Sequence, residues 1–137
     1  MSWESEVIIL KKTDKRLPDA ELEIMKVIWH NQTPISTSEV KQIIDDEGVN
    51  DWTQQTIQTL LNRLIAKEFI SKENRGKGYI YTPLISESDY ISYESKMFLE
   101  KLHGNSVTSL MRALFDRNKM SDEDISKLEE MFKEKQP

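Results

Sequence analysis

The sequence of 137 residues contains no cysteine. It therefore forms no disulfide framework, supplies no thiolate ligand to a metal ion and has no cysteine nucleophile. This absence agrees with a reducing compartment, and we expect a cytoplasmic protein. The length suits one compact core, or one small domain with a helical appendage.

A long hydrophobic run is also missing. Near the N-terminus only residues 7–10 form an apolar stretch, and no basic region precedes them as it does in a secretory signal. No later segment approaches the roughly 20 apolar residues that span a bilayer, so we expect no membrane insertion. The mean hydropathy of −0.61 leaves little apolar material for one closed core, which makes association with a second chain a natural supplement.

Patterns that support catalysis are absent as well. His30 and His103 are isolated, no serine occupies a nucleophile elbow, and neither a zinc-protease motif nor a Walker motif occurs. The carboxylates at 122–124 stand where a helix is expected to begin, and the helix dipole explains them more simply than a metal ion does. We expect neither an enzyme nor a protein that holds a metal or another cofactor.

The net charge of −5 is unevenly distributed along the chain. Residues 50–83 contain five basic and three acidic residues, whereas residues 84–137 contain eight basic and eleven acidic ones. A basic segment inside an acidic protein is compatible with a nucleic-acid partner, although the total charge alone argues mildly against one.

Two capped helices are predicted at the start of the folded part. The first begins after Pro18, carries apolar residues at helical spacing and ends near Asn31. A short turn follows, and Ser36 or Thr37 can cap a second helix, which Gly48 ends.

A third helix begins after Thr53 and frays near Glu68. One of its faces is apolar, with residues at i, i+3, i+4 and i+7: Ile57, Leu60, Leu61 and Leu64. The opposite face is polar and consists of Gln54, Gln55, Gln58, Thr59, Asn62 and Arg63. Such a face is either simply solvated or a contact surface.

A β-hairpin with a basic tip follows the third helix. Residues 69–72 and 79–82 have the composition of short strands, and 76–78 form the turn between them. A turn explains the two glycines there better than a phosphate-binding loop, because no helix follows directly. Pro83 ends the second strand.

Three further amphipathic helices are predicted after residue 84. The fourth starts at Ser86 with capping-box spacing to Asp89, the fifth covers 107–114, and the sixth starts at Ser121. With no strand to cover, they must bury their apolar faces on each other, on the first domain or on a second copy of the chain. A second copy is the simplest partner, and the residues expected in the dimer are Val107, Leu110, Met111, Leu114, Ile125 and Leu128.

The expected fold is mostly α with a small β-hairpin wing. Residues 1–16 would form an N-terminal extension, 17–84 a winged helix-turn-helix DNA-binding domain and 85–137 a three-helix dimerisation domain. Two capped helices before the polar face and a basic hairpin after it favour DNA contact over simple solvation.

The third helix would enter the major groove, where a glutamine amide can contact adenine through one donor and one acceptor. The residues expected at base edges are Gln54, Gln55, Gln58 and Thr59. Phosphates would be held by Thr53, Thr56, Arg63, Lys72, Arg75 and Lys77.

Three groups of residues resemble the penicillinase-repressor family, the BlaI/MecI group to which the copper-operon repressor CopY also belongs. They are the run 18–29, the Asp-Trp-Thr to Thr-Leu-x-x-Arg-Leu pattern over 51–64, and the hairpin residues Phe69, Ile70, Tyr79, Tyr81 and Pro83. The resemblance spans 17–135. It implies a homodimeric repressor, with a winged helix on palindromic operators and three C-terminal helices that dimerise, in a family associated with antibiotic resistance.

The resemblance also implies a way of releasing the repressor. Members of the antibiotic-resistance type are cleaved in the fifth helix at an Asn-Phe bond after a Ser-Leu run, so a membrane sensor protease is a candidate partner. Ala113 and Leu114 occupy that position here, which departs from the family pattern. Copper sensing through the cysteine cluster of the copper-responsive branch is excluded, because the chain has no cysteine.

The sequence thus predicts a homodimeric, sequence-specific transcriptional repressor. The alternative is a protein-interaction adaptor that keeps a winged-helix scaffold without binding DNA, which the charge of −5 would suit. The sequence leaves open whether the repressor is released from DNA by proteolysis, by a ligand or by a partner protein.

Overall fold

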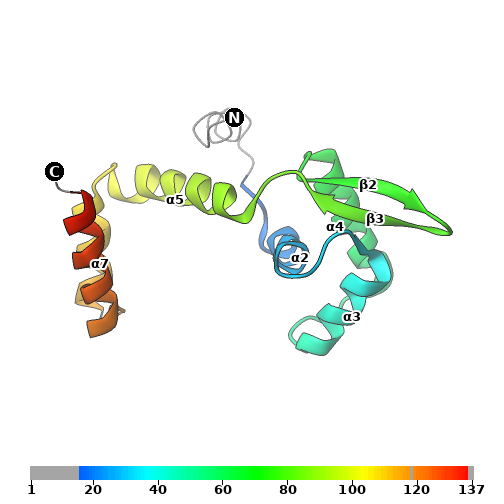
Figure 1. Ribbon diagram of the computed structural model, residues 1–137, viewed down its shortest axis with the longest axis horizontal. Helices are drawn as coiled ribbons and strands as arrows, with labels where there is room; N and C mark the ends of the chain where they lie inside the picture. The colour runs from blue at the N-terminus through cyan, green and yellow to red at the C-terminus, as the bar shows by residue number, and fades with distance from the viewer. Residues whose placement is uncertain (1–15, 118, 136–137) are drawn as a thin grey trace. The chain divides into compact units, whose positions relative to one another are not determined.

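The computed structural model describes residues 16–117 and 119–135 (Figure 1). The predicted N-terminal extension therefore lies outside the described residues, apart from Arg16. The elements follow the order α2, β1, α3, α4, β2, β3, α5, α6, α7. The chain divides into two compact units, 1–94 and 95–137, and the division falls inside helix α5. The domain boundary predicted after residue 84 stays a prediction.

Helices α2 (Asp19–His30) and α3 (Thr37–Glu47) begin and end where local signals predict. Pro18 precedes α2, since its fixed φ suits a helix start and its missing N–H removes no bond there. Ser36 forms a reciprocal capping box with Glu39. Gly48 ends α3 with φ of 69°, a left-handed conformation that glycine adopts without strain.

Helix α4 (Gln54–Ala66) is amphipathic, as its sequence predicts. The Thr53 hydroxyl accepts a hydrogen bond from the Thr56 backbone N–H at 3.1 Å and so caps the first turn. Its buried residues are Ile57, Leu60, Leu61 and Leu64. The helix ends at Ala66 with Lys67 as its C-cap, and Glu68 follows with φ of 65°.

The three strands form one antiparallel sheet in the order β1-β3-β2. Strand β1 (Ile35–Ser36) pairs with β3 (Gly78–Pro83), which in turn pairs with β2 (Ile70–Arg75). The hairpin strands are longer than predicted, because pairing continues until Arg75 faces Gly78. A two-residue loop containing left-handed Gly76 closes the hairpin. Figure 1 shows β2 and β3 extending together from the helices as a wing.

The first turns of α5 (Glu87–His103) complete the core of the first unit. Tyr90 is buried, and its hydroxyl accepts a hydrogen bond from the Leu17 backbone N–H at 2.7 Å. Its ring lies 5.7 Å from that of Trp29 and 5.6 Å from that of Phe69, measured between centroids. Burial raises the pKa of the Tyr90 hydroxyl above its ordinary value. Tyr93, which the sequence analysis did not single out, is also buried.

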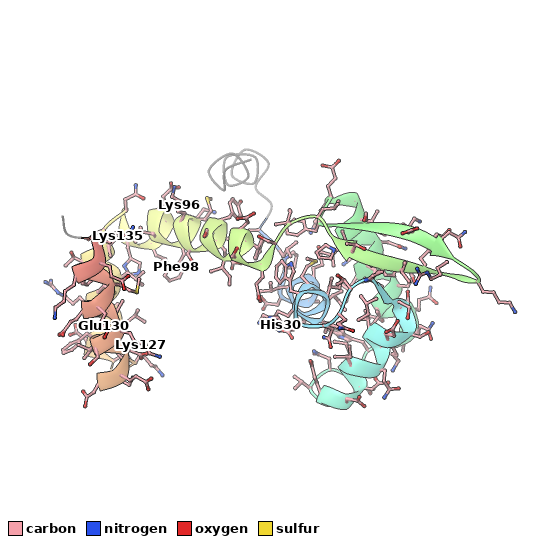
Figure 2. All side chains as sticks on the ribbon, viewed as in Figure 1. His30, Lys96, Phe98, Lys127, Glu130 and Lys135 are labelled. Atoms are coloured by element: carbon pink, nitrogen blue, oxygen red, sulfur yellow. The ribbon has the colours of Figure 1, made fainter. Side chains whose placement is uncertain are left out.

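The end of α2 is joined to α5 by polar contacts. Trp29 is half-buried, and its indole N–H donates to the Ile85 carbonyl at 2.9 Å just before α5. His30, labelled in Figure 2 at the end of α2, places its Nε2 2.6 Å from Glu87 Oε2.

The second unit contains the end of α5, α6 (Val107–Asp116) and α7 (Asp122–Lys135). Ser106 caps α6 through the Ser109 backbone N–H, and Ser121 and Asp124 cap α7 reciprocally at 3.1 Å. Neither α6 nor α7 has a buried residue in the single chain. Their apolar faces therefore stay accessible to solvent in the single chain.

Over residues 16–117 and 119–135, no helix combines the length and apolar composition required to cross a membrane.

One buried carboxylate gives a testable expectation for stability. Glu21 in α2 is only 2% exposed, and Lys67 at the end of α4 donates to it. Lys67→Met should lower the free energy of unfolding by about 1–3 kcal/mol, because it leaves a buried charge without this donor, and the partial exposure of Lys67 moderates the cost. Urea unfolding followed by circular dichroism measures the change.

The matched control is Lys26→Met, which removes an exposed ion pair with Glu23 at 3.5 Å and should cost no more than about 0.5 kcal/mol. Adding Glu21→Met to the Lys67 variant should recover part of the loss, because the uncompensated charge is then gone. Equal effects of the two lysine substitutions would contradict this role of the Glu21–Lys67 pair.

Candidate nucleic-acid interface

The polar face of α4 presents an open hollow to solvent. Gln54, Gln55, Gln58, Thr59 and Asn62 line it. Gln54, Gln55 and Thr59 are exposed, and the Thr59 hydroxyl donates to the Gln55 carbonyl at 3.0 Å, which leaves its lone pairs available to accept. The structure thus brings the four predicted base-edge residues to one surface, and their contact with DNA stays a prediction.

Gln58 differs from its neighbours because its side chain is half-buried and hydrogen-bonded within the protein. Its Nε2 donates to Asn62 Oδ1 and to Tyr81 Oη, each at 3.1 Å. Its Oε1 accepts from Thr37 Oγ1 at 3.0 Å. Sequence periodicity places Gln58 on the polar face correctly, but it does not show that the amide already has partners.

The basic residues of the wing are all exposed: Lys72, Arg75 and Lys77. Lys72 Nζ lies 4.6 Å from the centroid of the Tyr79 ring on the neighbouring strand, a cation–π contact that fixes the side chain at one face of the hairpin. Lys77 occupies the two-residue loop at the tip.

A second polar hollow joins the wing to two helices. Its lining comes from the start of α3, the start of α4 and the tip of the wing: Ser36, Thr37, Ser38, Gln54, Gln58, Lys77, Gly78 and Tyr79. The contribution of residues 36–38 was not predicted from the sequence. Their position at a capped helix start, where backbone N–H groups are free to donate, is the signal that could have found it.

The remaining predicted phosphate ligands lie at the two ends of α4. Thr53 and Thr56 are exposed at its start, where the Thr53 hydroxyl already serves as the cap and lies 3.1 Å from Thr56 Oγ1. Arg63 is exposed in its last turn. A backbone phosphate at the helix start would therefore meet hydroxyl groups and the positive end of the helix dipole.

Three of the four acidic residues of α3 lie away from this surface, and the fourth, Glu39, accepts a hydrogen bond from the Ser36 backbone N–H at 3.2 Å. The carboxylates at 45–47 stand at the end of α3, whereas the shared hollow lies at its start. The 11 residues of α3 correspond to a rise of about 16 Å. At that distance salt screens most of the repulsion that these carboxylates would exert on a phosphate.

Within the part of the chain that the structure describes, no three His, Cys, Asp or Glu side chains gather as possible metal ligands.

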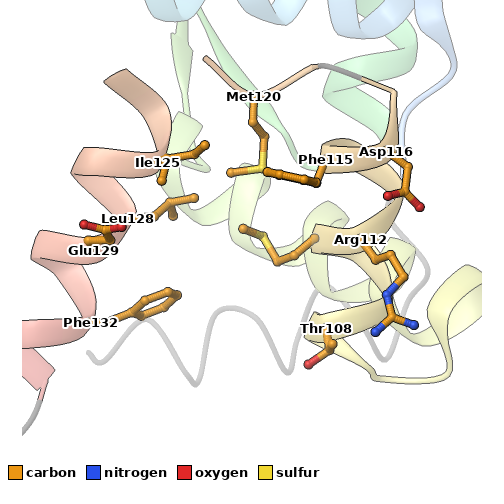
Figure 3. Close-up of a pocket in the computed structure, with 10 residues that line it drawn as sticks. Thr108, Arg112, Phe115, Asp116, Met120, Ile125, Leu128, Glu129 and Phe132 are labelled. Atoms are coloured by element: carbon orange, nitrogen blue, oxygen red, sulfur yellow. The ribbon is translucent and has the colours of Figure 1, made fainter. Parts of the chain in front are cut away.

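The second unit carries an apolar groove between α6 and α7, referred to below as the α6–α7 groove (Figure 3). Its apolar lining is Met111, Phe115, Met120, Ile125, Leu128 and Phe132, and its polar rim is Thr108, Arg112, Asp116 and Glu129. Three of the predicted dimer residues line it: Met111, Ile125 and Leu128. The other three, Val107, Leu110 and Leu114, lie on α6 outside its lining.

Residues 17–134 match the family model described as penicillinase repressor. The chain belongs to the penicillinase repressor family. The penicillinase repressor of Bacillus licheniformis is 37% identical over 123 residues, which are 88% of this chain and 94% of that protein. The methicillin resistance regulatory protein MecI of Staphylococcus aureus strain N315 is 29% identical over 119 residues, which are 87% of this chain and 94% of that protein.

A solved structure of a relative contains DNA. It is the solution structure of the monomeric form of Bacillus licheniformis BlaI in complex with the blaP half-operator, which is 45% identical, covers 55% of this chain and 88% of that chain, and has a TM-score of 0.44. The two curated relatives above are named as a repressor and a regulatory protein.

Ala113 and Leu114, which the family resemblance predicts to stand at the cleavage position, are both exposed in α6, and cleavage there stays a prediction.

Proposed function

We propose that this member of the penicillinase repressor family is a homodimeric, sequence-specific DNA-binding transcriptional repressor. The observation that carries the proposal is the polar hollow shared by α3, α4 and the wing, with Gln54 on one helix and Lys77 on the hairpin tip. A surface that combines an amide-rich helix with a basic hairpin can read bases and hold phosphates at the same time. The named relatives support this reading, since one of them was solved with a half-operator.

In this proposal α4 is the recognition helix and lies in the major groove. The exposed amides of Gln54 and Gln55 and the Thr59 hydroxyl approach base edges, where a glutamine supplies the donor and acceptor that adenine requires. Gln58 belongs to the same face. Phosphates are held by Thr53, Thr56, Arg63, Lys72, Arg75 and Lys77, which set the register of the helix in the groove.

Two copies of the chain would associate through the second unit. The α6–α7 groove and the neighbouring apolar residues of α6 are uncovered in the single chain, and burying them against a second copy removes apolar surface from water. A two-fold dimer presents two recognition helices to a palindromic operator, so each chain contacts one half-site.

Release from DNA by proteolysis has a plausible physical route. A cut between Ala113 and Leu114 would divide α6 and separate part of the lining of the α6–α7 groove from the rest. The dimer would weaken while the DNA-binding unit stayed intact. A membrane sensor protease that makes this cut is the partner proposed for this route.

The test is selection of DNA from a random duplex pool, followed by gel-shift titration of the enriched duplex against a shuffled duplex of equal composition. Enrichment of a palindrome with two matching half-sites is the expected result. If no duplex is enriched and the weak binding is insensitive to salt, the protein-interaction adaptor becomes the better description, which the net charge of −5 suits.

Single substitutions should separate phosphate contacts from base contacts. Lys77→Ala should weaken binding to every duplex alike and reduce the slope of log affinity against log salt by about 1, because one phosphate contact is lost. Gln55→Ala should reduce discrimination at one base pair by about 1–3 kcal/mol and leave the slope unchanged. Gel-shift titrations on single-base-pair variants of the enriched duplex measure both effects.

Lys135→Ala, at the end of α7, is the matched control for the loss of one positive charge far along the chain from the wing. It should change neither quantity. Identical behaviour of the Lys77 and Gln55 variants would contradict the assignment of one to phosphate and the other to a base.

A further inference from the structure

Three elements of the DNA-binding unit meet at the hydroxyl of Tyr81. Tyr81 lies in β3, and its Oη accepts from Gln58 Nε2 of α4 at 3.1 Å and lies 3.2 Å from Thr37 Oγ1 of α3, whose single hydroxyl hydrogen is donated to Gln58 Oε1. We propose that Tyr81 is a positioning residue for operator recognition that acts through Gln58. In this proposal Gln58 is a strut, meaning a side chain whose hydrogen bonds hold α4 against β3, and it does not contact bases itself. This inference rests on the proposed function and assigns new roles within its site.

The hydrogen-bonding capacity of the Gln58 amide is largely used inside the protein. An amide offers two N–H donors and two acceptor lone pairs. Both donors are engaged, one by Asn62 Oδ1 and one by Tyr81 Oη, and one lone pair accepts from Thr37. Bidentate contact with adenine needs one donor and one acceptor of the same amide. Gln58 could make that contact only by giving up a bond to Asn62 or Tyr81.

Tyr81 is a suitable anchor because its own position is fixed by the fold. Its ring is fully buried, and its Cα is paired with Ile35 of β1 on one side and Lys72 of β2 on the other. Only rotation of the hydroxyl hydrogen is left to it. The atom that receives the Gln58 amide therefore does not move independently of the sheet.

The consequence for recognition is a fixed spacing between the helix and the wing. The Gln58 strut ties the middle of α4 to β3, the strand that runs directly from the wing tip at Gly78. Phosphate contacts made by the wing set the register in which the α4 side chains meet bases. A rotation of α4 about its own axis would displace Gln54 and Gln55 from their base edges. The phosphate contacts of the wing would stay largely in place.

The decisive variant is Tyr81→Phe, which keeps the ring and removes only the hydroxyl. Binding is measured on the duplex enriched by the wild-type chain and on its shuffled counterpart. The ratio of the two affinities should fall about fivefold to tenfold, the effect of losing a hydrogen-bonded positioning contact. Affinity for the shuffled duplex should not change, because phosphate contacts supply it.

A combined variant shows whether Tyr81 acts through Gln58. In the Gln58→Ala background, adding Tyr81→Phe should produce no further loss of preference, because the strut is already absent. In the free, isotope-labelled chain, the Gln58 side-chain amide protons should exchange with water several-fold faster after Tyr81→Phe. That NMR measurement reports on the strut without any DNA.

Tyr90→Phe is the matched control, since it removes a buried tyrosine hydroxyl that accepts from the Leu17 backbone N–H instead. It should lower the melting temperature and leave the preference unchanged. Should Tyr81→Phe fail to fold, Thr37→Val removes a hydroxyl from the same network, leaves the ring in place and should lower the preference likewise.

Each contrary outcome is distinct. A wild-type chain that retains no DNA overturns the proposed function and the role of Tyr81 together. A wild-type chain that prefers its selected duplex, with a Tyr81→Phe variant of equal preference or with additive effects in the Gln58→Ala background, overturns the role of Tyr81 alone. Unchanged exchange of the Gln58 amide protons does the same.

Discussion

Replacing Leu128 with aspartate should convert the proposed dimer into monomers and lower affinity for a full palindromic operator by about a hundredfold or more, since each chain then binds its half-site alone. Leu128 lines the apolar α6–α7 groove, where burying a carboxylate against a second copy would cost the free energy of its desolvation. Sedimentation equilibrium should give the mass of one chain, 16.1 kDa, in place of twice that value.

The location of the effect can be checked with a half-operator duplex. Wild-type and Leu128→Asp chains should bind the half-operator equally, because the substitution leaves the first unit untouched. Ser126→Asp places the same charge two residues away, on an exposed position of α7 roughly opposite Leu128, and should leave the dimer intact. A Leu128→Asp chain that keeps the dimer mass would show that another surface holds the two copies together.

Operator affinity should also depend steeply on salt. A dimer that neutralises about six phosphates should lose on the order of a thousandfold in affinity between 50 and 200 mM monovalent salt, because binding releases the counterions condensed on DNA. The four basic side chains expected at phosphates are all exposed: Arg63, Lys72, Arg75 and Lys77. Gel-shift titration at several salt concentrations gives the slope.

Two controls make the salt experiment specific. Sedimentation at each salt concentration should show an unchanged mass, so that loss of DNA binding is not loss of the dimer. The Gln55→Ala chain should show the wild-type slope, because a base contact releases no counterions. A salt-insensitive affinity would exclude the phosphate-based interface.

The boundaries of the first helices could be predicted because short-range chemistry determines them. The Ser36 capping box and left-handed Gly48 act within α3 and its caps, and Thr53 caps α4 through a residue three positions away. The fold class follows from the same signals together with the hairpin. The length of the hairpin could not be predicted. Residues 76–78 all have turn character, and the sequence does not show that the loop consists of Gly76 and Lys77 alone.

The features that were missed depend on residues far apart in the sequence. Glu21 is buried because Lys67, 46 positions later, donates to it, and periodicity alone would place a glutamate at the surface. Gln58 finds Thr37 and Tyr81 at separations of 21 and 23 positions. Local patterns identify which residues share a helix face, but not which of them are already bonded when the chain is folded.

The uncovered faces of α6 and α7 have a consequence for the amount of repressor in a cell. Helices of 10 and 14 residues with no buried side chain gain little stability on their own. If a second copy supplies that stability, the folding of this unit is coupled to chain concentration by mass action. Newly made chains at low abundance would then expose these helices to degradation, whereas chains above the dimerisation threshold would be protected. The protein level would therefore rise sharply rather than gradually with its rate of synthesis.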